Sequence, residues 1–422
     1  MLDNLHSILS TASSFVWGPW LLIPLLLGTG LFLTFRLSGI QFRTLGRSMR
    51  HALIDKQEDG EGDISNYQAL TTALAATVGT GNIVGVATAI ALGGPGALFW
   101  IWVTGAVGMA SKYTEAYLGV RFRVTDAKGA QSGGPQEYLR RGIPGPVGQI
   151  LAFLFTVFAI FASFGIGNLT QGNSVAAGME DTFGVDPWIT GIIMFVAVGA
   201  VLLGGIQAIG KITSAFVPLM IFVYVTGGIV ALVLMADQIP AALGAVFTDA
   251  FTGTAATGGF LGAGIMMAVR FGVARGIFSN ESGMGSAAIA AAAAKTSHPT
   301  RQALVSMTQT FIDTMIVVSI TGLVIVTSGV WDQGADHAAT MTADAFSTVL
   351  GSQWGGTIVS VSLIFFAFST IIGWSYYGER SIVSLLGQWR PCPTVSSSPA
   401  WSSSARSPRL RSPGPSPTWP TA

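Results

Sequence analysis

The chain has 422 residues, of which half are hydrophobic and only 10% are charged, and its mean hydropathy is +0.59. So much apolar surface must face something other than water, which argues against a soluble protein. A net charge of +1 gives no argument about nucleic acid, but no basic stripe with interleaved aromatic residues is present. One cysteine, Cys392, excludes a disulfide framework and a thiol-based metal site. The composition predicts a polytopic membrane protein.

Nine apolar runs separated by polar loops are long enough to cross a bilayer, because a spanning helix needs about 20 mostly apolar residues. Irregular backbone is not tolerated in contact with hydrocarbon, so each run is predicted to be helical. The first run is followed by basic residues in place of a small-residue cleavage site, which predicts a retained span. The expected spans are 17–38, 68–92, 96–120, 147–174, 187–205, 212–236, 260–294, 302–329 and 354–388.

Lysine and arginine fall in alternate loops, and cytoplasmic loops are enriched in these residues. The loops at 170–187, 237–259 and 330–353 contain neither, whereas the loop after the first span is rich in arginine. This pattern predicts a multi-pass protein of the cell's inner (plasma) membrane with its N-terminus outside. Nine spans then place the C-terminal tail in the cytoplasm.

The second span carries a polar, glycine-containing centre, AATVGTGNIVGV, at residues 75–86. Gly79 and Gly81 allow the backbone to turn and a ligand to approach closely, and Thr77, Thr80 and Asn82 supply donors and acceptors. Close packing between helices is the alternative explanation for small residues in a span.

The seventh run has a comparable interruption in RFGVARGIFSNESGMGS, residues 270–286. Asn280, Glu281, Ser282 and Gly283 would distort a helix at membrane depth, which is tolerated where they are buried in protein or line a wet cavity. The second and seventh runs cross in opposite directions, a pattern typical of an inverted repeat. Broken helices expose unpaired amides at one end and carbonyls at the other, so two that meet can hold a zwitterion and a cation.

Five long motifs carry a resemblance: TVGTGNIVGVATAIALGGPGALFWIW, SKYTEAYLGVRFR, GGPQEYL, RGIFSNESGMGSA and FAFSTIIGWSYYGER. From residue 15 to 388 the chain resembles the alanine/glycine:cation symporter family. The resemblance implies sodium-coupled uptake of alanine and glycine by alternating access. It also implies an all-α fold of the leucine-transporter (LeuT) type, with one extra N-terminal helix before two inverted repeats and two discontinuous helices.

The implied domains follow the spans. They are an extra transmembrane helix at 1–40, a cytoplasmic loop at 41–67, a first five-helix repeat at 68–236, an incomplete second repeat of three helices at 237–388, and a tail at 389–422. The tail is rich in serine, proline and arginine and is predicted to be disordered. Family members continue here with two more helices, so the tail departs from the family pattern.

Carried over by motif, the first unwound segment supplies Thr77, Gly79, Thr80, Gly81 and Asn82 to the substrate, and the second supplies Phe278, Ser279 and Asn280. Gln171 matches a substrate-contacting glutamine. The resemblance also implies that Ser369 and Thr370 bind sodium together with carbonyls near Thr77 and Val78, because hard cations prefer oxygen ligands. Trp374 either caps the pocket or is an ordinary core aromatic.

Buried charges need an explanation because they are costly in a membrane. Glu281 is expected to hold the second break or a cation, and Asp313 to pair with a basic group. Arg270 and Arg275 either line an entry vestibule or, by slight preference, pair with a loop carboxylate. Lys112 and Glu115 are interpreted as a helix-end pair.

No nucleophile and base arrangement and no metal-hydrolase motif is visible, so an enzyme is not expected, and no cofactor other than co-transported sodium is implied. The predicted partners are alanine or glycine, Na⁺ and the lipid bilayer, with no nucleic acid. Two alternatives stay open, a channel-like pore lined by the broken helices and a truncated carrier without transport.

Overall fold

The computed structural model describes residues 2–18, 20–55, 60–126, 129–252, 261–334 and 337–389. Within these ranges the chain is almost entirely helical. The predicted disordered tail beyond residue 389, including Cys392, lies outside the described residues.

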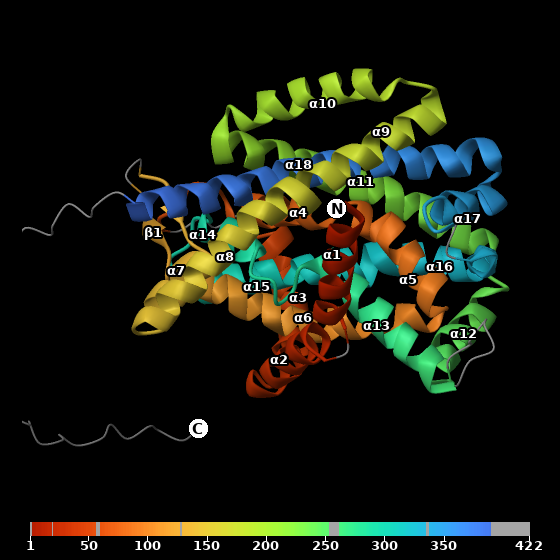
Figure 1. Ribbon diagram of the computed structural model, residues 1–422, viewed down its shortest axis with the longest axis horizontal. Coiled ribbons are helices and arrows are strands. Elements are labelled where there is room, and N and C mark those ends of the chain that lie inside the picture. The colour runs from red at the N-terminus through yellow and green to blue at the C-terminus, as the bar shows by residue number, and fades with distance from the viewer. Residues whose placement is uncertain are drawn as a thin grey trace, which may run out of the picture.

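Long helices run side by side along the long axis of the molecule and form the bundle seen in Figure 1. Within the described ranges, four helical stretches are long and apolar enough to cross a bilayer, and two sharply bent helix pairs raise the number to six. The long helices are α6 (Gly96–Arg121), α8 (Pro146–Phe164), α11 (Gly205–Leu234), α15 (Pro299–Thr310) with η3 (Phe311–Val318) and α16 (Ser319–Ser328), and α18 (Ser352–Trp389).

Each of the nine predicted runs contains a helix, although not every one meets a strict test of length and apolarity. α6 carries Lys112 and Glu115 and is covered by other helices, so it does not need an apolar surface of its own. α10 (Pro187–Leu202) is apolar but only 16 residues long. The outer face of the bundle exposes large apolar side chains, such as Phe195 at 80% and Phe222 at 68%, as expected of a surface in contact with lipid.

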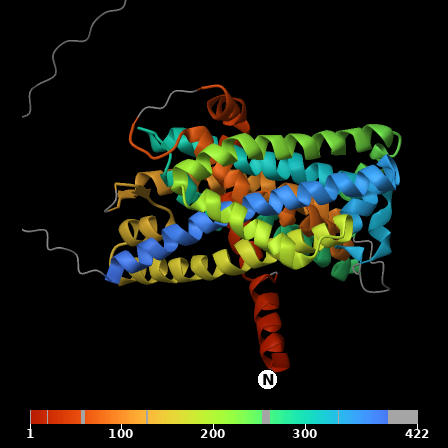
Figure 2. The same cartoon turned by 90° about the horizontal axis from the view of Figure 1, so that it is seen from above.

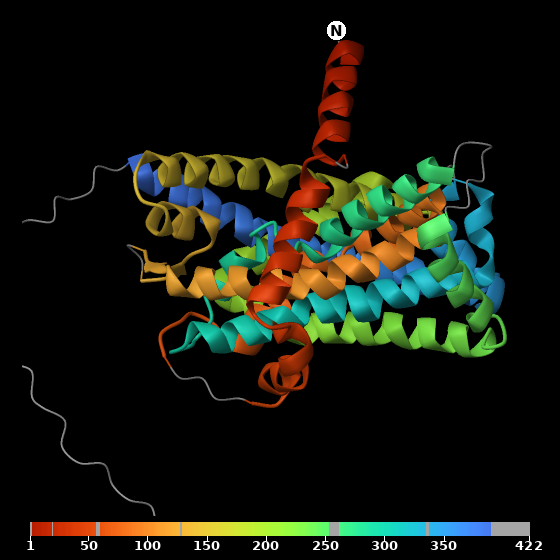
Figure 3. The same cartoon turned by 90° about the horizontal axis from the view of Figure 1, so that it is seen from below.

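Three helices precede the first broken span. α1 (Leu2–Val16) projects away from the bundle (Figures 2 and 3), and α2 (Leu22–Arg36) packs on α6. α3 (Ile40–Leu53) turns 81° from α2. Sequence interpretation treated residues 41–67 as a loop, whereas α3 occupies much of this stretch. Left-handed backbone at Ser38 (φ 53°) and Gly39 (φ 65°) redirects the chain, and the segment then continues as an amphipathic helix.

Two spans are discontinuous, as predicted. The first consists of α4 (Asn66–Thr77), the π-helical turn η1 (Gly81–Gly85) and α5 (Val86–Gly93), and it bends by 56°. The second consists of α13 (Leu261–Asn280) and α14 (Ala287–Ala292).

The two broken spans run in opposite directions (Figure 1). Ile64, just before α4, pairs with Ala294, just after α14. At the other end, a Cβ placed on Gly93 would lie 3.1 Å from the Cα of Ala268 in α13. The start of one span is therefore beside the end of the other, which confirms the inverted arrangement.

The remaining elements connect or cover these spans. A small antiparallel hairpin pairs Val124 with Ser132 and Thr125 with Gln131. The elements are β1 (Val124–Thr125), β2 (Gln131–Ser132), α7 (Pro135–Gly142), η2 (Gly165–Leu169), α9 (Thr170–Phe183), α12 (Ile239–Thr252), η4 (Val330–Gln333) and α17 (Met341–Leu350).

Candidate functional site

The first break is held open by Asn82. Helix α4 begins with a capping box at Ser65 and ends at Thr77, where Val78 adopts an extended conformation (ψ 90°). The Asn82 side-chain oxygen accepts a hydrogen bond from the Gly79 amide at 3.0 Å, and the Asn82 amide donates to the Gly79 carbonyl at 3.1 Å. These two bonds replace some of the backbone hydrogen bonds that are lost where the helix is interrupted inside the bundle.

The second break lies slightly later in the chain than predicted. Phe278, Ser279 and Asn280 belong to the last turn of α13, not to the unwound segment. Left-handed backbone at Glu281 (φ 53°) then ends the helix. Gly283 and Gly285 are also left-handed and carry the chain to α14, a conformation that glycine adopts without strain.

The two breaks meet inside the bundle. A Cβ placed on Gly81 would lie 3.4 Å from the Phe278 ring and 3.6 Å from the Ser279 Cα. Asp313 joins the two breaks because its carboxylate accepts hydrogen bonds from the Asn82 side-chain amide nitrogen at 2.7 Å and the Ser279 hydroxyl at 2.9 Å. The prediction that Asp313 pairs with a basic group is therefore wrong among the described residues. Neutral donors, including the Thr314 hydroxyl, bind this carboxylate instead.

Lys112 reaches the second break from α6. It is fully buried, and its ammonium donates to the Glu281 carbonyl at 3.0 Å and lies 3.8 Å from a Glu115 carboxylate oxygen. Glu115 in turn accepts a hydrogen bond from the Gly285 amide at 2.8 Å. The interpretation as a helix-end pair is corrected accordingly. The two residues do pair, but they bind unpaired backbone groups of the break from inside the bundle.

A small cavity of about 40 Å³ lies where the breaks meet. It contains six of the predicted substrate residues, namely Thr77, Gly79, Gly81, Gln171, Phe278 and Trp374, together with Ala76, Ala162, Ile166, Glu281, Met284 and Thr370.

Four other predicted residues, Thr80, Asn82, Ser279 and Asn280, are not among the residues that line this cavity. Each of these residues makes at least one hydrogen bond to another protein group. The Thr80 amide donates to the Gln171 side-chain oxygen at 3.3 Å, and the Asn280 side chain bonds to Thr314 and to the Ser282 amide. These residues shape the cavity by fixing its walls.

Several lining residues had no distinguishing signal in the sequence. Ile166 and Met284 are apolar side chains that do not differ in type from residues facing lipid.

Trp374 is 5% exposed and packs edge-on against Tyr377, and a Cβ placed on Gly167 would lie 2.4 Å from the Trp374 Cβ. Trp374 is therefore both a buried core aromatic and a wall of the cavity.

Oxygen atoms converge beside the cavity, between α4 and α18. The Thr370 hydroxyl lies 3.1 Å from the Ala75 carbonyl and 3.4 Å from the Val78 carbonyl, and the Ser369 hydroxyl lies 3.3 Å from the Ala75 carbonyl. The Thr77 hydroxyl is engaged elsewhere, because it donates to the Ala73 carbonyl and accepts from Gln309. Two hydroxyls and two carbonyls are a donor set suited to a hard monovalent cation.

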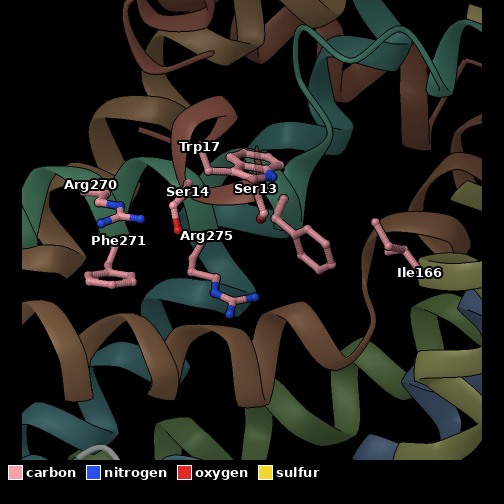
Figure 4. Close-up of a pocket in the computed structure, with 9 residues that line it drawn as sticks. Ser13, Ser14, Trp17, Ile166, Arg270, Phe271 and Arg275 are labelled. Atoms are coloured by element: carbon pink, nitrogen blue, oxygen red, sulfur yellow. The ribbon is translucent and has the colours of Figure 1, made fainter. Parts of the chain in front are cut away.

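A larger cavity of about 290 Å³ adjoins the central one and shares Ile166 and Phe278 with it. Figure 4 shows Arg270 and Arg275 from α13 beside Ser14 and Trp17 in this cavity. Among the described residues, no ion pair of either arginine is seen, and both line this cavity, which favours the vestibule interpretation.

The segments next to the two breaks are clamped together where α4 begins. The Lys295 amide donates to the Ile64 carbonyl at 2.7 Å. The Arg123 guanidinium donates to the carbonyls of Ala294 and Glu61, each at 2.8 Å. Burial raises the pKa of Asp63 beside this clamp, and the hydrogen bond from the Gln131 amide opposes that shift.

Comparison with known proteins identifies the family. The model of the sodium:alanine symporter family matches residues 2–396. The chain belongs to this family. It is 50% identical to the sodium/alanine symporter AgcS of Methanococcus maripaludis over 90% of this chain and 84% of the relative.

Two further relatives extend this comparison. An uncharacterized transporter of Haemophilus influenzae is 50% identical over 91% of this chain and 83% of its own length. A probable sodium/glutamine symporter, GlnT, of Bacillus subtilis is 36% identical over 90% and 78%, respectively. The chain is thus a multi-pass membrane transporter and not an enzyme.

Proposed function

We propose that this transporter carries a small neutral amino acid, alanine or glycine, into the cell together with Na⁺. The observation that carries the proposal is the small cavity between two antiparallel helix breaks, bordered by the glycine backbone of the first break and by a cluster of oxygen atoms. Membership of the sodium:alanine symporter family supports it. The domain division and the outside location of the N-terminus belong to the same proposal.

The substrate carboxylate is assigned to the end of the first break. Here the helix formed by η1 and α5 begins, and its first amides and its dipole favour an anion. Gly79 and Gly81 line the cavity at this point, so no side chain separates the ligand from the backbone. Gln171 adds a side-chain amide from the neighbouring helix α9.

The size of the cavity favours a substrate with a very short side chain. A cavity needs at least about 10–15 Å³ to hold one water molecule. The central cavity, at about 40 Å³, therefore has room for about three water molecules. Small shifts of Phe278 or Met284 accommodate alanine or glycine, whereas a glutamine side chain requires the walls to move further. This is consistent with the alanine named for the archaeal relative.

The sodium ion is assigned to the oxygen cluster formed by the Ser369 and Thr370 hydroxyls with the Ala75 and Val78 carbonyls. The ion would link α4 to α18 beside the substrate. Binding of Na⁺ therefore fixes the end of α4 that borders the cavity, which couples the ion to the amino acid. Val78 was anticipated from the sequence, and the Ala75 carbonyl takes the place expected of Thr77.

Uptake into proteoliposomes tests the proposal. Labelled alanine is supplied outside vesicles containing the full chain, with an inward Na⁺ gradient, with equal Na⁺ on both sides, and with K⁺ in place of Na⁺. We expect accumulation above the external concentration with the gradient alone. Downhill leak independent of Na⁺ would indicate a channel, and silence in all three conditions would indicate a carrier that does not transport.

A further inference from the structure

Glu281 is the acidic residue that lines the central cavity. Its left-handed backbone is uncommon for a residue with a side chain, and only 3% of the residue is exposed. One carboxylate oxygen accepts a hydrogen bond from the Ser286 hydroxyl. The break therefore contains a buried carboxylate on a residue that lines the space where a substrate would lie.

The nearby cation is already engaged with other groups. The Lys112 ammonium donates to the backbone carbonyl of Glu281 and approaches Glu115. Among the described residues, no ion pair is formed by the Glu281 carboxylate itself. Arg275 stacks over the Phe278 ring in the outer cavity, with its guanidinium carbon 5.8 Å from the ring centroid.

The charges around the breaks are therefore unbalanced. Glu115, Glu281 and Asp313 are buried carboxylates, while Lys112 is the one buried ammonium among the described residues that contact the second break. Burying a charge without a partner is costly, and a mobile cation that enters the cavity removes the cost. Asp313 has three neutral donors, which leaves Glu281 as the group facing the cavity.

We propose that the Glu281 carboxylate binds the ammonium group of the transported amino acid. This assignment rests on the proposed function and adds the basis of its selectivity. The substrate then spans the cavity, with its carboxylate on the helix end at Gly79 and Gly81 and its ammonium on Glu281. A small carboxylic acid without an amino group leaves Glu281 unpaired and is rejected.

The test compares alanine with propionate, which has the same carbon skeleton and no amino group. Affinities of the purified full chain are measured in saturating Na⁺ by displacement of labelled alanine. In Glu281→Gln we expect alanine to bind about tenfold to a hundredfold more weakly, because a hydrogen bond between charged groups is lost. Propionate binding should stay the same or improve, so the ratio of the two affinities falls.

Two matched variants separate binding from folding. Ser286→Ala removes one neutral donor to the Glu281 carboxylate and keeps its charge, so the alanine to propionate ratio should persist. Glu281→Asp keeps the charge and shortens the side chain by one methylene, so it should weaken alanine binding without affecting propionate, even if the glutamine variant fails to fold.

Three other results would contradict the assignment of Glu281 or the proposed function. An unchanged ratio in folded Glu281→Gln overturns the assignment and leaves the proposed function intact. Lower Na⁺ affinity at an unchanged ratio also overturns it, because Glu281 would then serve the metal ion. If wild-type protein binds no alanine in Na⁺, the proposed function fails and this assignment fails with it.

Discussion

Replacement of Thr370 by alanine tests the cation site most sharply. The Thr370 hydroxyl is one of four oxygen ligands assigned to Na⁺, at 3.1 Å from the Ala75 carbonyl and 3.4 Å from the Val78 carbonyl. Loss of one interaction with a charged group costs about 1.5 to 3 kcal/mol. We therefore expect Thr370→Ala to raise the Na⁺ concentration for half-maximal alanine uptake about tenfold to a hundredfold.

The assay measures initial alanine uptake into proteoliposomes over a range of external Na⁺. Thr370→Ser retains the hydroxyl and should restore most of the Na⁺ affinity. Ser381→Ala provides the matched control, because Ser381 is a buried hydroxyl on the same helix that donates to the Tyr377 carbonyl, away from the cavity. Unchanged Na⁺ dependence in Thr370→Ala, or an equal change in Ser381→Ala, would refute the assignment.

Three further substitutions probe the first break, the cavity wall and the clamp. Asn82→Ala removes the 2.7 Å donor to a buried carboxylate, so we expect uptake to fall and the melting temperature to drop by several degrees, while unchanged values of both would contradict its bridging role. Gly167→Ala places a Cβ 2.4 Å from the Trp374 Cβ and should displace this wall of the cavity. The alanine concentration for half-maximal uptake should therefore rise, and an unchanged concentration would show that Trp374 can shift without affecting the substrate. Arg123→Gln removes donors to four backbone carbonyls and should loosen the clamp. A cysteine introduced at Ala76, which lines the cavity, should then be labelled faster by a reagent supplied from the clamp side, whereas equal rates would show that the clamp does not restrict access to the cavity.

Much of the fold could be predicted because its signals are local. The length of the apolar runs gave the spans, and Gly79 with Gly81 in the middle of one run gave the first break. The position of the second break was less predictable. The motif around Phe278 is compatible with a helical or an unwound backbone, and the outcome depends on left-handed conformations at Glu281, Gly283 and Gly285.

The details of the site depend on contacts between distant segments. Asp313 is separated by 231 residues from Asn82, and Lys112 by 169 from Glu281, so neither partner follows from local spacing. Sequence reasoning therefore found the residues near the cavity but assigned several of them direct contact with a ligand. Asn82 and Ser279 instead fix the walls through Asp313.

Helix α3 was not predicted from the sequence, for a different reason. Its sequence has no apolar run long enough to span, so span detection assigned it to a loop. Its alternating basic and apolar residues form a short helix at 81° to α2. Amphipathic periodicity was the signal that could have identified it.

The most direct test of the central claim is an experimental structure of the full chain with alanine and Na⁺ bound. We expect the amino acid in the cavity lined by Gly79, Gly81 and Phe278, with its ammonium on Glu281 and the ion beside Thr370. Alanine bound outside the space between the two breaks, or a helix continuous from α4 into α5, would contradict the account.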